Sequence, residues 1–340
     1  MKAAVLTDWN HLEIKEVPDL SLGDQEVLIR VAYTGICGSD IHSFVGRHPL
    51  AHKGMILGHE FSGTVEKTGP RCEEIPAGAK VCAHIIQPCG HCDACKKGNF
   101  NLCRSLKVLG TQVEGTFAEY VKVRKERVLL LPETADLKAC AMAEPLAVGV
   151  YAAGRFDVKI SDRVLVLGAG PIGLCCALAA QKAGACQVVL SEVAEKRIQF
   201  AKDMGFEVID SRKKNLEEEA ERITEGAGFD YLFETSGVPV STELLTKVGA
   251  VRGSAVMVAY AKEPRPIDTW NLMRKEIQIS SIRVHTQPAY EAAVRMILSD
   301  EKLSGQLLHM ITGEFAFAEI QKAFTECVNG QEHCKIIVKM

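Results

Sequence analysis

Residues 163–173 read RVLVLGAGPIG, and this stretch decides the fold of the second half of the chain. An apolar run typical of a buried strand leads into the pattern GxGxxG, and a helical pattern follows directly. The glycines allow a tight turn and a close approach of the backbone to a pyrophosphate; they are Gly168, Gly170 and Gly173. Pro171 suits the first turn of the helix, and Ile172 stands directly before the last glycine of the motif. The stretch predicts a dinucleotide-binding turn; the alternative is a glycine turn in an α/β domain that binds no nucleotide.

The same strand-then-helix rhythm continues after this turn. The strands QVVLSE (187–192) and FDYLFE (229–234) are each followed by a helical pattern, so the sequence predicts an α/β domain with a doubly wound parallel sheet. Glu192 closes the second strand, where a carboxylate would accept hydrogen bonds from the adenosine ribose and repel a 2′-phosphate. This favours NAD over NADP. Arg197 could soften that preference, or it could simply be an exposed helix arginine.

The first part of the chain has a different sequence pattern. Short β-rich runs such as VLIRVAY (27–33) and FSGTVEKTG (61–69) alternate with glycine and proline, which predicts a mostly β domain. We place the boundary near residue 150. After residue 285 the strand-helix rhythm is lost, so residues 286–340 are expected to pack elsewhere.

Composition excludes several classes of partner. The chain has 340 residues, with 40 basic and 43 acidic side chains and a net charge of −3, which gives no reason to expect a nucleic-acid or anionic-membrane partner. The start MKAAVLTDWNHLEIKE lacks the apolar region of a signal peptide. No stretch approaches the roughly 20 apolar residues that span a bilayer. We therefore expect a cytoplasmic protein with a small-molecule ligand.

Four of the thirteen cysteines lie within residues 89–103, CGHCDACKKGNFNLC. In a cytoplasmic protein an odd number of cysteines argues against disulfides, and a redox CxxC would need a thioredoxin-like βαβ context. An iron–sulfur cluster is chemically possible, although its usual spacings differ. Four thiolates on one short loop fill every position of a tetrahedral zinc ion, so we predict a structural zinc site. Its ligands are Cys89, Cys92, Cys95 and Cys103.

A second set of ligand types lies in the segments GICGSDIH (35–42) and LGHEFSG (57–63). Cys37 and His59 offer a thiolate and an imidazole, and Glu60 or the more distant Glu144 offers a carboxylate. Three protein ligands with a fourth position open make a catalytic metal site. A lone cysteine and histidine would more often be core residues. Here a hydroxyl, a carboxylate and a second imidazole crowd the same loop, at Ser39, Asp40 and His42.

These motifs, in this order, resemble the zinc-containing medium-chain alcohol dehydrogenases, and among them the sorbitol (polyol) dehydrogenase branch. The resemblance covers essentially the whole chain, and its carriers also include GTFAEYV (115–121) and EPLAVGV (144–150). It implies a GroES-like catalytic domain over 1–150 with two zinc sites, a Rossmann domain over 151–285 that binds NAD, and a C-terminal segment, 286–340, that returns to the catalytic domain. It also implies a homodimer or homotetramer.

The resemblance assigns roles to the clustered residues. Glu144 stands where alcohol dehydrogenases of the Cys2His type have a cysteine ligand, which points to polyol substrates; relatives with this glutamate bind the metal through Glu60, Glu144 or both in alternation. Ser39 and His42 would relay a proton to solvent, and Asp40 would hydrogen-bond His59. The resemblance therefore implies hydride transfer from a zinc-bound secondary alcohol to NAD.

Three residues are candidates for substrate contact. Phe44 and Arg47 follow the catalytic loop, and Arg283 ends the predicted last Rossmann strand, where an arginine of sorbitol dehydrogenases reaches substrate oxygens. That arginine is often followed by an aromatic residue, and here Val284 follows instead. Together with His285, Arg47 and Lys53, Arg283 would suit a carboxylate or phosphate terminus; the alternative is ordinary surface basic residues.

The leading prediction is an NAD-dependent oxidation of a secondary hydroxyl on a sugar alcohol or sugar acid. L-Threonine 3-dehydrogenase and vicinal-diol (butanediol) dehydrogenase activities are the alternatives within the family. A family member kept as a non-catalytic binding or structural protein is opposed by the intact ligand and glycine motifs. A zinc module for nucleic acid is opposed by the few basic residues near the cysteine loop.

Overall fold

The computed structural model describes residues 1–261, 263–330 and 333–340, and the chain forms two compact units. The β-rich unit comprises Met1–Glu144 and Thr286–Met340, and the βα unit comprises Pro145–His285. The chain passes from one to the other within helix α4 (Ala143–Ala153), so the boundary predicted near residue 150 falls inside a helix. Pro145 does not interrupt this helix, because a proline in the first turn breaks no intrahelical hydrogen bond.

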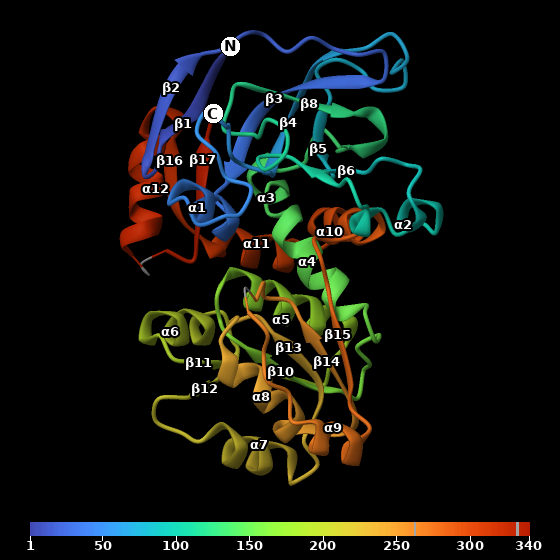
Figure 1. The fold of residues 1–340 in the computed structure, drawn as a ribbon, viewed down its shortest axis with the longest axis vertical. Coiled ribbons are helices and arrows are strands. Elements are labelled where there is room, and N and C mark those ends of the chain that lie inside the picture. Colours follow the sequence, from blue (N-terminus) through green and yellow to red (C-terminus); the bar gives the residue numbers. More distant parts are fainter. Residues whose placement is uncertain (262, 331–332) are drawn as a thin grey trace. The chain divides into compact units, whose positions relative to one another are not determined.

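In the described part of the βα unit, six parallel strands form one sheet in the order β12-β11-β10-β13-β14-β15 (Figure 1). Counted along the chain from β10, this is the order 3-2-1-4-5-6 of a doubly wound dinucleotide-binding sheet. The α/β prediction is confirmed. The strands are β10 (Arg163–Leu167), β11 (Gln187–Glu192), β12 (Glu207–Asp210), β13 (Phe229–Glu234), β14 (Gly249–Met257) and β15 (Gln278–Ser281).

The strand β10 is buried on both faces, as its unbroken apolar run requires. On one face, side chains of α7 and α8 pack on Leu165 and Leu232 in the core of this unit. The helices that follow the strands are α5 (Pro171–Ala183), α6 (Glu195–Asp203), α7 (Leu216–Thr224), α8 (Pro239–Val248) and α9 (Thr269–Lys275).

The turn between β10 and α5 has the geometry that its glycines allow. Gly168 has φ = +107°, a left-handed conformation that is strained for any residue with a side chain. A Cβ on Gly173 would lie 2.0 Å from the carbonyl oxygen of Gly168, so this helix position tolerates no side chain. Pro171 is the first residue of α5.

The described part of the β-rich unit contains a seven-stranded sheet in the order β16-β17-β3-β4-β5-β9, with β8 paired to β3 outside this path. Its strands are β3 (Glu26–Gly35), β4 (Glu60–Thr68), β5 (Lys80–Ala83), β8 (Tyr120–Arg124), β9 (Val128–Leu130), β16 (Ile311–Ala316) and β17 (Lys335–Lys339). Smaller two-stranded sheets are formed by β1 (Lys2–Asp8) with β2 (His11–Glu16), and by β6 (Ile86–Gln87) with β7 (Lys107–Val108). Short helices include α1 (Gly38–Phe44), α2 (Asp93–Lys96) and α3 (Leu137–Cys140).

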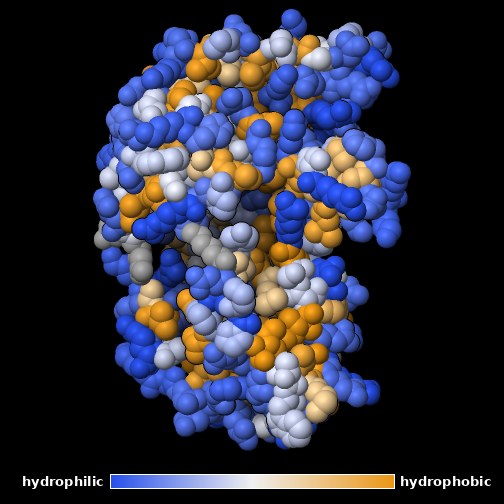
Figure 2. Space-filling view, viewed as in Figure 1, coloured by the Kyte–Doolittle hydropathy of each residue, from blue (hydrophilic) through white to orange (hydrophobic). Residues whose placement is uncertain are grey.

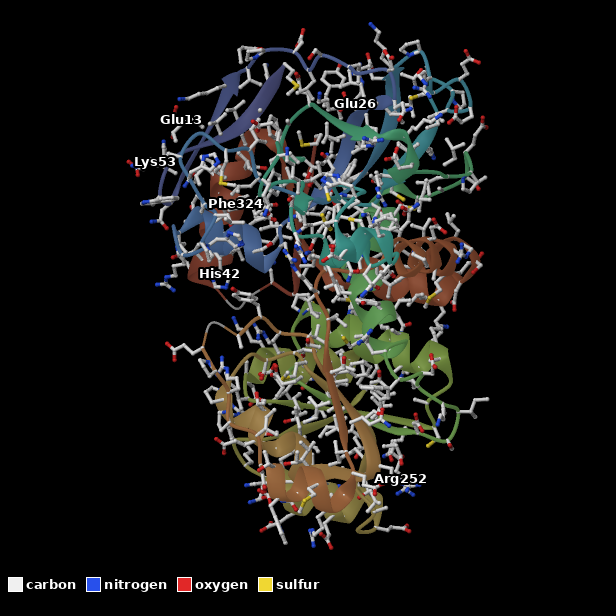
Figure 3. The ribbon with its side chains drawn as sticks, turned by 45° about the vertical axis from the view of Figure 1, so that its right-hand side comes forward. Glu13, Glu26, His42, Lys53, Arg252 and Phe324 are labelled. Atoms are coloured by element: carbon white, nitrogen blue, oxygen red, sulfur yellow. The ribbon has the colours of Figure 1, made fainter. Side chains whose placement is uncertain are left out.

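The C-terminal segment belongs to the β-rich unit. Its elements are α10 (Gln287–Ser299), α11 (Glu301–Met310), β16, α12 (Ile320–Asn329) and β17. Strand β17 pairs antiparallel with β3, so the last strand belongs to the same seven-stranded sheet as β3 and β4. In the core, Phe324 of α12, labelled in Figure 3, packs on Phe44 and Phe117 with ring centroids 5.1 and 5.3 Å apart.

Hydrophilic residues cover much of the face drawn in Figure 2, with hydrophobic residues scattered among them. Within the described ranges, no helix has the length and apolar character needed to cross a membrane.

Gly173→Ala should lower the melting temperature of the βα unit by several degrees, because the added methyl group cannot fit against the Gly168 carbonyl. Gly305→Ala is the matched control: Gly305 lies inside α11, nothing lies within 4 Å of its virtual Cβ, and alanine there should be neutral or stabilising. Thermal unfolding followed by circular dichroism measures both. Equal melting temperatures for Gly173→Ala and the parent chain would contradict the close approach.

Candidate metal centres and nucleotide site

Asp40 joins the two segments that carry the predicted catalytic ligands. Its Oδ2 accepts the backbone N–H of Cys37 at 2.9 Å, and its Oδ1 accepts the N–H of Gly58 at 3.1 Å. The side chain is buried, on the first turn of α1. One carboxylate therefore fixes the Cys37 loop against the loop that precedes His59.

The imidazole of His59 lies beside that carboxylate, with Nδ1 3.5 Å from Asp40 Oδ1. His59 is buried, which opposes protonation, but Asp40 and Cys37 raise the pKa of His59 well above its ordinary value. The charge around this ring is therefore strongly negative. A divalent cation bound there would experience the same attraction.

Three of the predicted catalytic ligands come together. Cys37, His59 and Glu60 each offer one ligand atom, and these atoms lie within 4.8 Å of one another. A thiolate, an imidazole and a carboxylate are the donor types that zinc binds, and three of them leave a position open. The described residues therefore fit a catalytic zinc ion, with Glu60 as its carboxylate ligand.

Glu144 lies at the start of α4 and is buried, but it is not a member of this three-residue group. Its charge still acts on the group. Burial is the main cause that raises the pKa of Glu60; Lys335 opposes this rise and Glu144 adds to it. Direct ligation of the metal by Glu144 stays a prediction.

Lys335 is the residue of this site that the sequence did not reveal. Its Nζ forms an ion pair with the Glu60 carboxylate and donates to the Ile36 carbonyl at 3.0 Å. Side-chain exposures are 4% for Lys335 and 1% for Glu60, so this is an ion pair in the protein interior. Although burial opposes its ionisation, Glu60 raises the pKa of Lys335, which therefore stays charged.

Gly35 makes room for this pair. A Cβ on Gly35 would lie 2.2 Å from Glu60 Oε2 and 3.1 Å from Lys335 Cε. Glycine pairs with Glu60 across β3 and β4, and β17 brings Lys335 to the same place. The only local signal was a lysine at the start of an apolar strand, KIIVK, and that pattern does not identify its distant partner.

The other predicted members of the catalytic loop lie on α1. Ser39 is half-buried, whereas His42 is exposed one turn later (labelled in Figure 3). Residues three apart lie on the same side of a helix, so the two polar groups share one side of α1. Along this side the exposure increases from Ser39 to His42.

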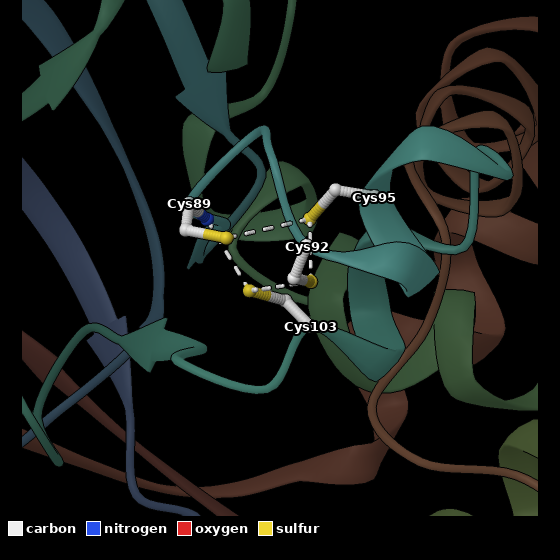
Figure 4. A group of neighbouring side chains, drawn as sticks. All are labelled: Cys89, Cys92, Cys95 and Cys103. Carbon is white, nitrogen blue, oxygen red and sulfur yellow. Dashed lines mark hydrogen bonds between the residues drawn. The ribbon is translucent and has the colours of Figure 1, made fainter.

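The four-cysteine loop forms a second cluster, with all four Sγ atoms within 4.8 Å of one another (Figure 4). The Sγ atom of Cys92 lies 3.5 Å from that of Cys95 and 3.9 Å from that of Cys103, and Cys89 Sγ lies 4.0 Å from Cys95 Sγ. Four sulfurs placed tetrahedrally about 2.3 Å from a zinc ion are about 3.8 Å apart. The cluster therefore fits a structural zinc ion.

Backbone N–H groups favour the thiolate form in part of this cluster. Those of Arg104 and Cys95 lower the pKa of Cys92 to about 6, and that of His91 is the main cause of the lowered pKa of Cys89. Burial raises the pKa of Cys95 to about 12. All thirteen cysteines are free thiols, so disulfides play no part in this loop.

Glu192 lies at the end of β11, facing the glycine turn. Its Oε1 accepts the N–H groups of Val193 and Ala194 at 2.7 and 3.0 Å, and its Oε2 accepts the N–H of Ala169 at 2.9 Å. A carboxylate offers about four acceptor positions, so one remains for a ligand hydroxyl. Glu192 therefore braces the glycine turn as well as offering a contact to a ribose.

Arg197 is also close to this turn. Its Nη1 lies 4.0 Å from Glu192 Oε2 and 3.8 Å from the position of a Cβ on Gly170. The guanidinium therefore lies close to both the acid and the glycine turn, and it is partly exposed. A contact of Arg197 with the cofactor stays a prediction.

The candidate substrate residues have different environments. Phe44 is 1% exposed and is part of the core of the β-rich unit, so the structure gives it a packing role and not a role in substrate binding. Every third or fourth residue of α1 faces that core, and Phe44 is one of them. Arg47 and Arg283 are exposed, just beyond α1 and β15.

Comparison with known proteins agrees with this geometry. Residues 23–133 match the alcohol dehydrogenase GroES-like domain, and residues 171–299 match the zinc-binding dehydrogenase family. A sorbitol dehydrogenase from Halalkalibacterium halodurans is 33% identical over 340 residues, covering 97% of this chain and 97% of the relative. A D-arabitol-phosphate dehydrogenase from Enterococcus avium is 33% identical over 314 residues, 91% of this chain and 88% of the relative. The crystal structure of an L-idonate 5-dehydrogenase from Escherichia coli aligns with a TM-score of 0.88 at 26% identity, covering 100% of this chain and 98% of the other.

The β-rich unit with its two ligand clusters and the doubly wound sheet with its glycine turn are the two parts of a zinc-dependent dehydrogenase. The chain belongs to the zinc-containing medium-chain alcohol dehydrogenase family, and its relatives place it in the polyol dehydrogenase branch. The family predicted from the sequence is confirmed, and so is the GroES-like and Rossmann fold class.

Lys335→Met should lower the free energy of unfolding of the β-rich unit by about 3 kcal/mol or more, because it leaves the Glu60 carboxylate buried without its cation. The double variant Lys335→Met/Glu60→Gln should recover much of that loss. Urea unfolding of the single and double variants measures the coupling between the two side chains.

Lys322→Met serves as the control, because Lys322 is 63% exposed and its Nζ lies 3.8 Å from Glu319 at the surface. Its removal should change the free energy of unfolding by less than about 1 kcal/mol. An equal loss in the single and double variants would contradict the coupling of Lys335 to Glu60.

Proposed function

We propose that this enzyme oxidises a secondary hydroxyl of a sugar alcohol or sugar acid, with NAD as hydride acceptor and one zinc ion in each of the two clusters. The observation that carries the proposal is the buried group of Cys37, His59 and Glu60, whose ligand atoms lie within 4.8 Å of one another. The relatives described above, which act on sorbitol, D-arabitol phosphate and L-idonate by their names, support the substrate class.

In the catalytic cluster, Cys37, His59 and Glu60 would hold the metal, with Glu144 as a further carboxylate. When bound, the metal supplies the Lewis acidity that lowers the pKa of a substrate hydroxyl. Asp40 orients His59, and Lys335 holds the Glu60 carboxylate in place. Glutamate instead of a second thiolate leaves more positive charge for oxygen-rich substrates.

The proton released from the substrate needs an exit, and α1 offers one. The hydroxyl of Ser39 would accept it near the buried cluster, and the exposed imidazole of His42 would pass it to water. Histidine is suited to this step because its pKa lies near neutrality. NAD, when bound, would supply the acceptor for the hydride that leaves the carbon bearing the substrate hydroxyl.

The nucleotide would bind at the β10–α5 turn, with its pyrophosphate at the N-terminus of α5 and its adenosine ribose at Glu192. The negative charge of Glu192 disfavours the 2′-phosphate of NADP, which supports NAD. The hydrogen bonds that Glu192 accepts from three backbone N–H groups fix the position of this carboxylate.

Arg283 is our candidate for contact with an anionic end of the substrate, with Arg47 as the second candidate cation. Val284, directly after Arg283, has φ = 54°; among the described residues it is the one β-branched residue with a positive φ. Such strain costs on the order of 1–3 kcal/mol and is concentrated at functional sites. Lys53 is the weaker candidate of the basic residues named above, because its Nζ pairs with Asp8 at 2.7 Å.

The working protein would be a cytoplasmic homodimer or homotetramer. Two large side chains of α9, Trp270 and Met273, are each 66% exposed, which fits a face covered by a second subunit. Neither nucleic acid nor a membrane is needed for the proposed reaction.

NADH formation over a panel of neutral polyols, sugar acids, sugar-alcohol phosphates, threonine and butanediol, with NAD and NADP in parallel, tests the proposal. Turnover of polyols or their acids with NAD supports it. A preference for threonine or butanediol would contradict the proposed substrate class but not the proposed dehydrogenase chemistry. Absence of turnover over the whole panel with zinc and NAD bound would contradict the proposed substrates.

Arg283→Ala should raise the KM for carboxylate- or phosphate-bearing polyols by about tenfold or more, because a charge-assisted contact is lost, while the KM for neutral polyols changes by less than about threefold. Arg295→Ala, on the exposed face of α10, is the control with the same change of charge. Steady-state kinetics measure both. An equal rise in the KM for charged and neutral substrates would indicate that Arg283 binds substrate hydroxyls and not an anionic end.

A further inference from the structure

Six charged side chains gather where β11 and β12 end, and the proposed function uses only one of them, Glu192. The acids are Glu192, Glu195 and Asp210, and the bases are Arg197, Arg212 and Lys213. The last residues of the two strands, Glu192 and Asp210, pair in the parallel register. By the general geometry of doubly wound sheets, the adenosine ribose lies at this end of β11.

Arg212 is held firmly within this group. Its Nε donates to Asp210 Oδ1 at 2.8 Å and its Nη2 donates to Asp210 Oδ2 at 2.7 Å, a two-pronged arginine–carboxylate contact. Its Nη2 also forms an ion pair with Glu195. The hydrogen bond from Arg212 lowers the pKa of Asp210, so this pair stays fully charged near neutral pH.

The position of Arg212 ties it to the Glu192 end of the sheet. The N–H of Ser211 donates to the Glu192 carbonyl at 3.0 Å, and the hydroxyls of Ser191 and Ser211 lie 2.7 Å apart. Glu195 directly follows Ala194, whose N–H binds the Glu192 carboxylate. The guanidinium of Arg212 therefore lies beside the first turn of α6, next to the segment that fixes Glu192.

A 2′-phosphate on the ribose would need a cation at this end of the sheet. Two arginines stand near Glu192, and each is already engaged by acids. Arg197 lies toward the glycine turn and faces Glu192 itself, whereas Arg212 lies on the β12 side and faces Asp210 and Glu195. Glu195 is 64% exposed and Arg212 is 38% exposed, so both side chains meet solvent, and a phosphate that binds Nη2 of Arg212 would compete with the Glu195 carboxylate for that nitrogen.

We propose that Glu195 is a specificity-determining residue: by occupying Arg212, it excludes a 2′-phosphate and so adds to the discrimination that Glu192 imposes. This inference rests on the proposed dinucleotide site at the β10–α5 turn and deepens it. The enzyme then prefers NAD for two separate reasons. Glu192 repels the 2′-phosphate, and Glu195 pairs with Arg212, the arginine that could bind this phosphate.

Glu195 is also the cleaner residue to change. Glu192 holds the glycine turn through the N–H of Ala169, so its removal would weaken NAD and NADP alike. Asp210 also meets Lys213 at 3.5 Å, so its removal would free two cations at once. Glu195→Gln removes one charge from a side chain whose carboxylate pairs with Arg212.

The test measures the Kd of NAD and of NADP by isothermal titration calorimetry for the full chain, Glu195→Gln, and Glu195→Gln/Arg212→Met. Glu195→Gln should tighten NADP by about tenfold, the gain expected of one charge-assisted hydrogen bond, and leave NAD within about twofold. The double variant should lose that gain. Glu217→Gln is the matched control, because Glu217 pairs with Lys247 at 3.1 Å elsewhere on the same unit.

Unchanged NADP affinity in Glu195→Gln would overturn the inference, and so would a gain that persists when Arg212 is also replaced. An equal gain in Glu217→Gln would reduce the effect to overall charge and overturn it as well. If the parent chain binds neither NAD nor NADP, the proposed nucleotide site fails and the inference fails with it. If the parent chain binds NAD and only the NADP gain is missing, the inference fails alone.

Discussion

The catalytic half of this enzyme depends on a buried ion pair between Glu60 and Lys335. Two charges in a protein interior are tolerated only when each has a partner, because removal from water costs several kcal/mol per ion. Glu60 begins β4 and Lys335 begins β17, near the end of the chain. The Glu60 carboxylate of the proposed metal site therefore has its counter-charge only when the C-terminal strand has joined the sheet.

Asp40 applies the same principle on the other side of the cluster. Its two carboxylate oxygens accept N–H groups from the Cys37 loop and from the loop before His59, so one buried acid fixes two ligands. In the βα unit, Glu192 likewise accepts N–H groups from the glycine turn, at Ala169, and from the segment after β11, at Ala194. In both units a buried acid fixes loops that are far apart in the sequence. The positions of the binding residues thus depend on hydrogen bonds to the backbone, and the backbone is less mobile than the side chains.

The features predicted from sequence were those whose chemistry is local. The glycine turn at Gly168 and Gly173 needs a backbone conformation that only glycine adopts without strain. Four cysteines within residues 89–103 are close enough in sequence to bind one ion, whatever the position of the loop in the fold. Lys335 was missed because its role exists only through pairing with β3 and β4, and no local pattern encodes that contact. Phe44 was assigned to substrate from its place after the catalytic loop, whereas the packing of α12 on α1 makes it a core residue. The domain boundary was displaced for a related reason, since α4 continues through the junction between the two units.

The central claim is that Cys37 belongs to a catalytic metal site and Cys103 to a separate structural one. Metal-to-protein ratios by plasma mass spectrometry, for the parent chain, Cys37→Ser and Cys103→Ser, test it most directly when NADH formation is followed on the same samples. We expect about two zinc ions in the parent chain and about one in each variant. Cys37→Ser should stay folded and lose turnover, whereas Cys103→Ser should lose stability first. A Cys37→Ser variant that keeps both zinc ions, or that turns over substrate as fast as the parent chain, would contradict the account.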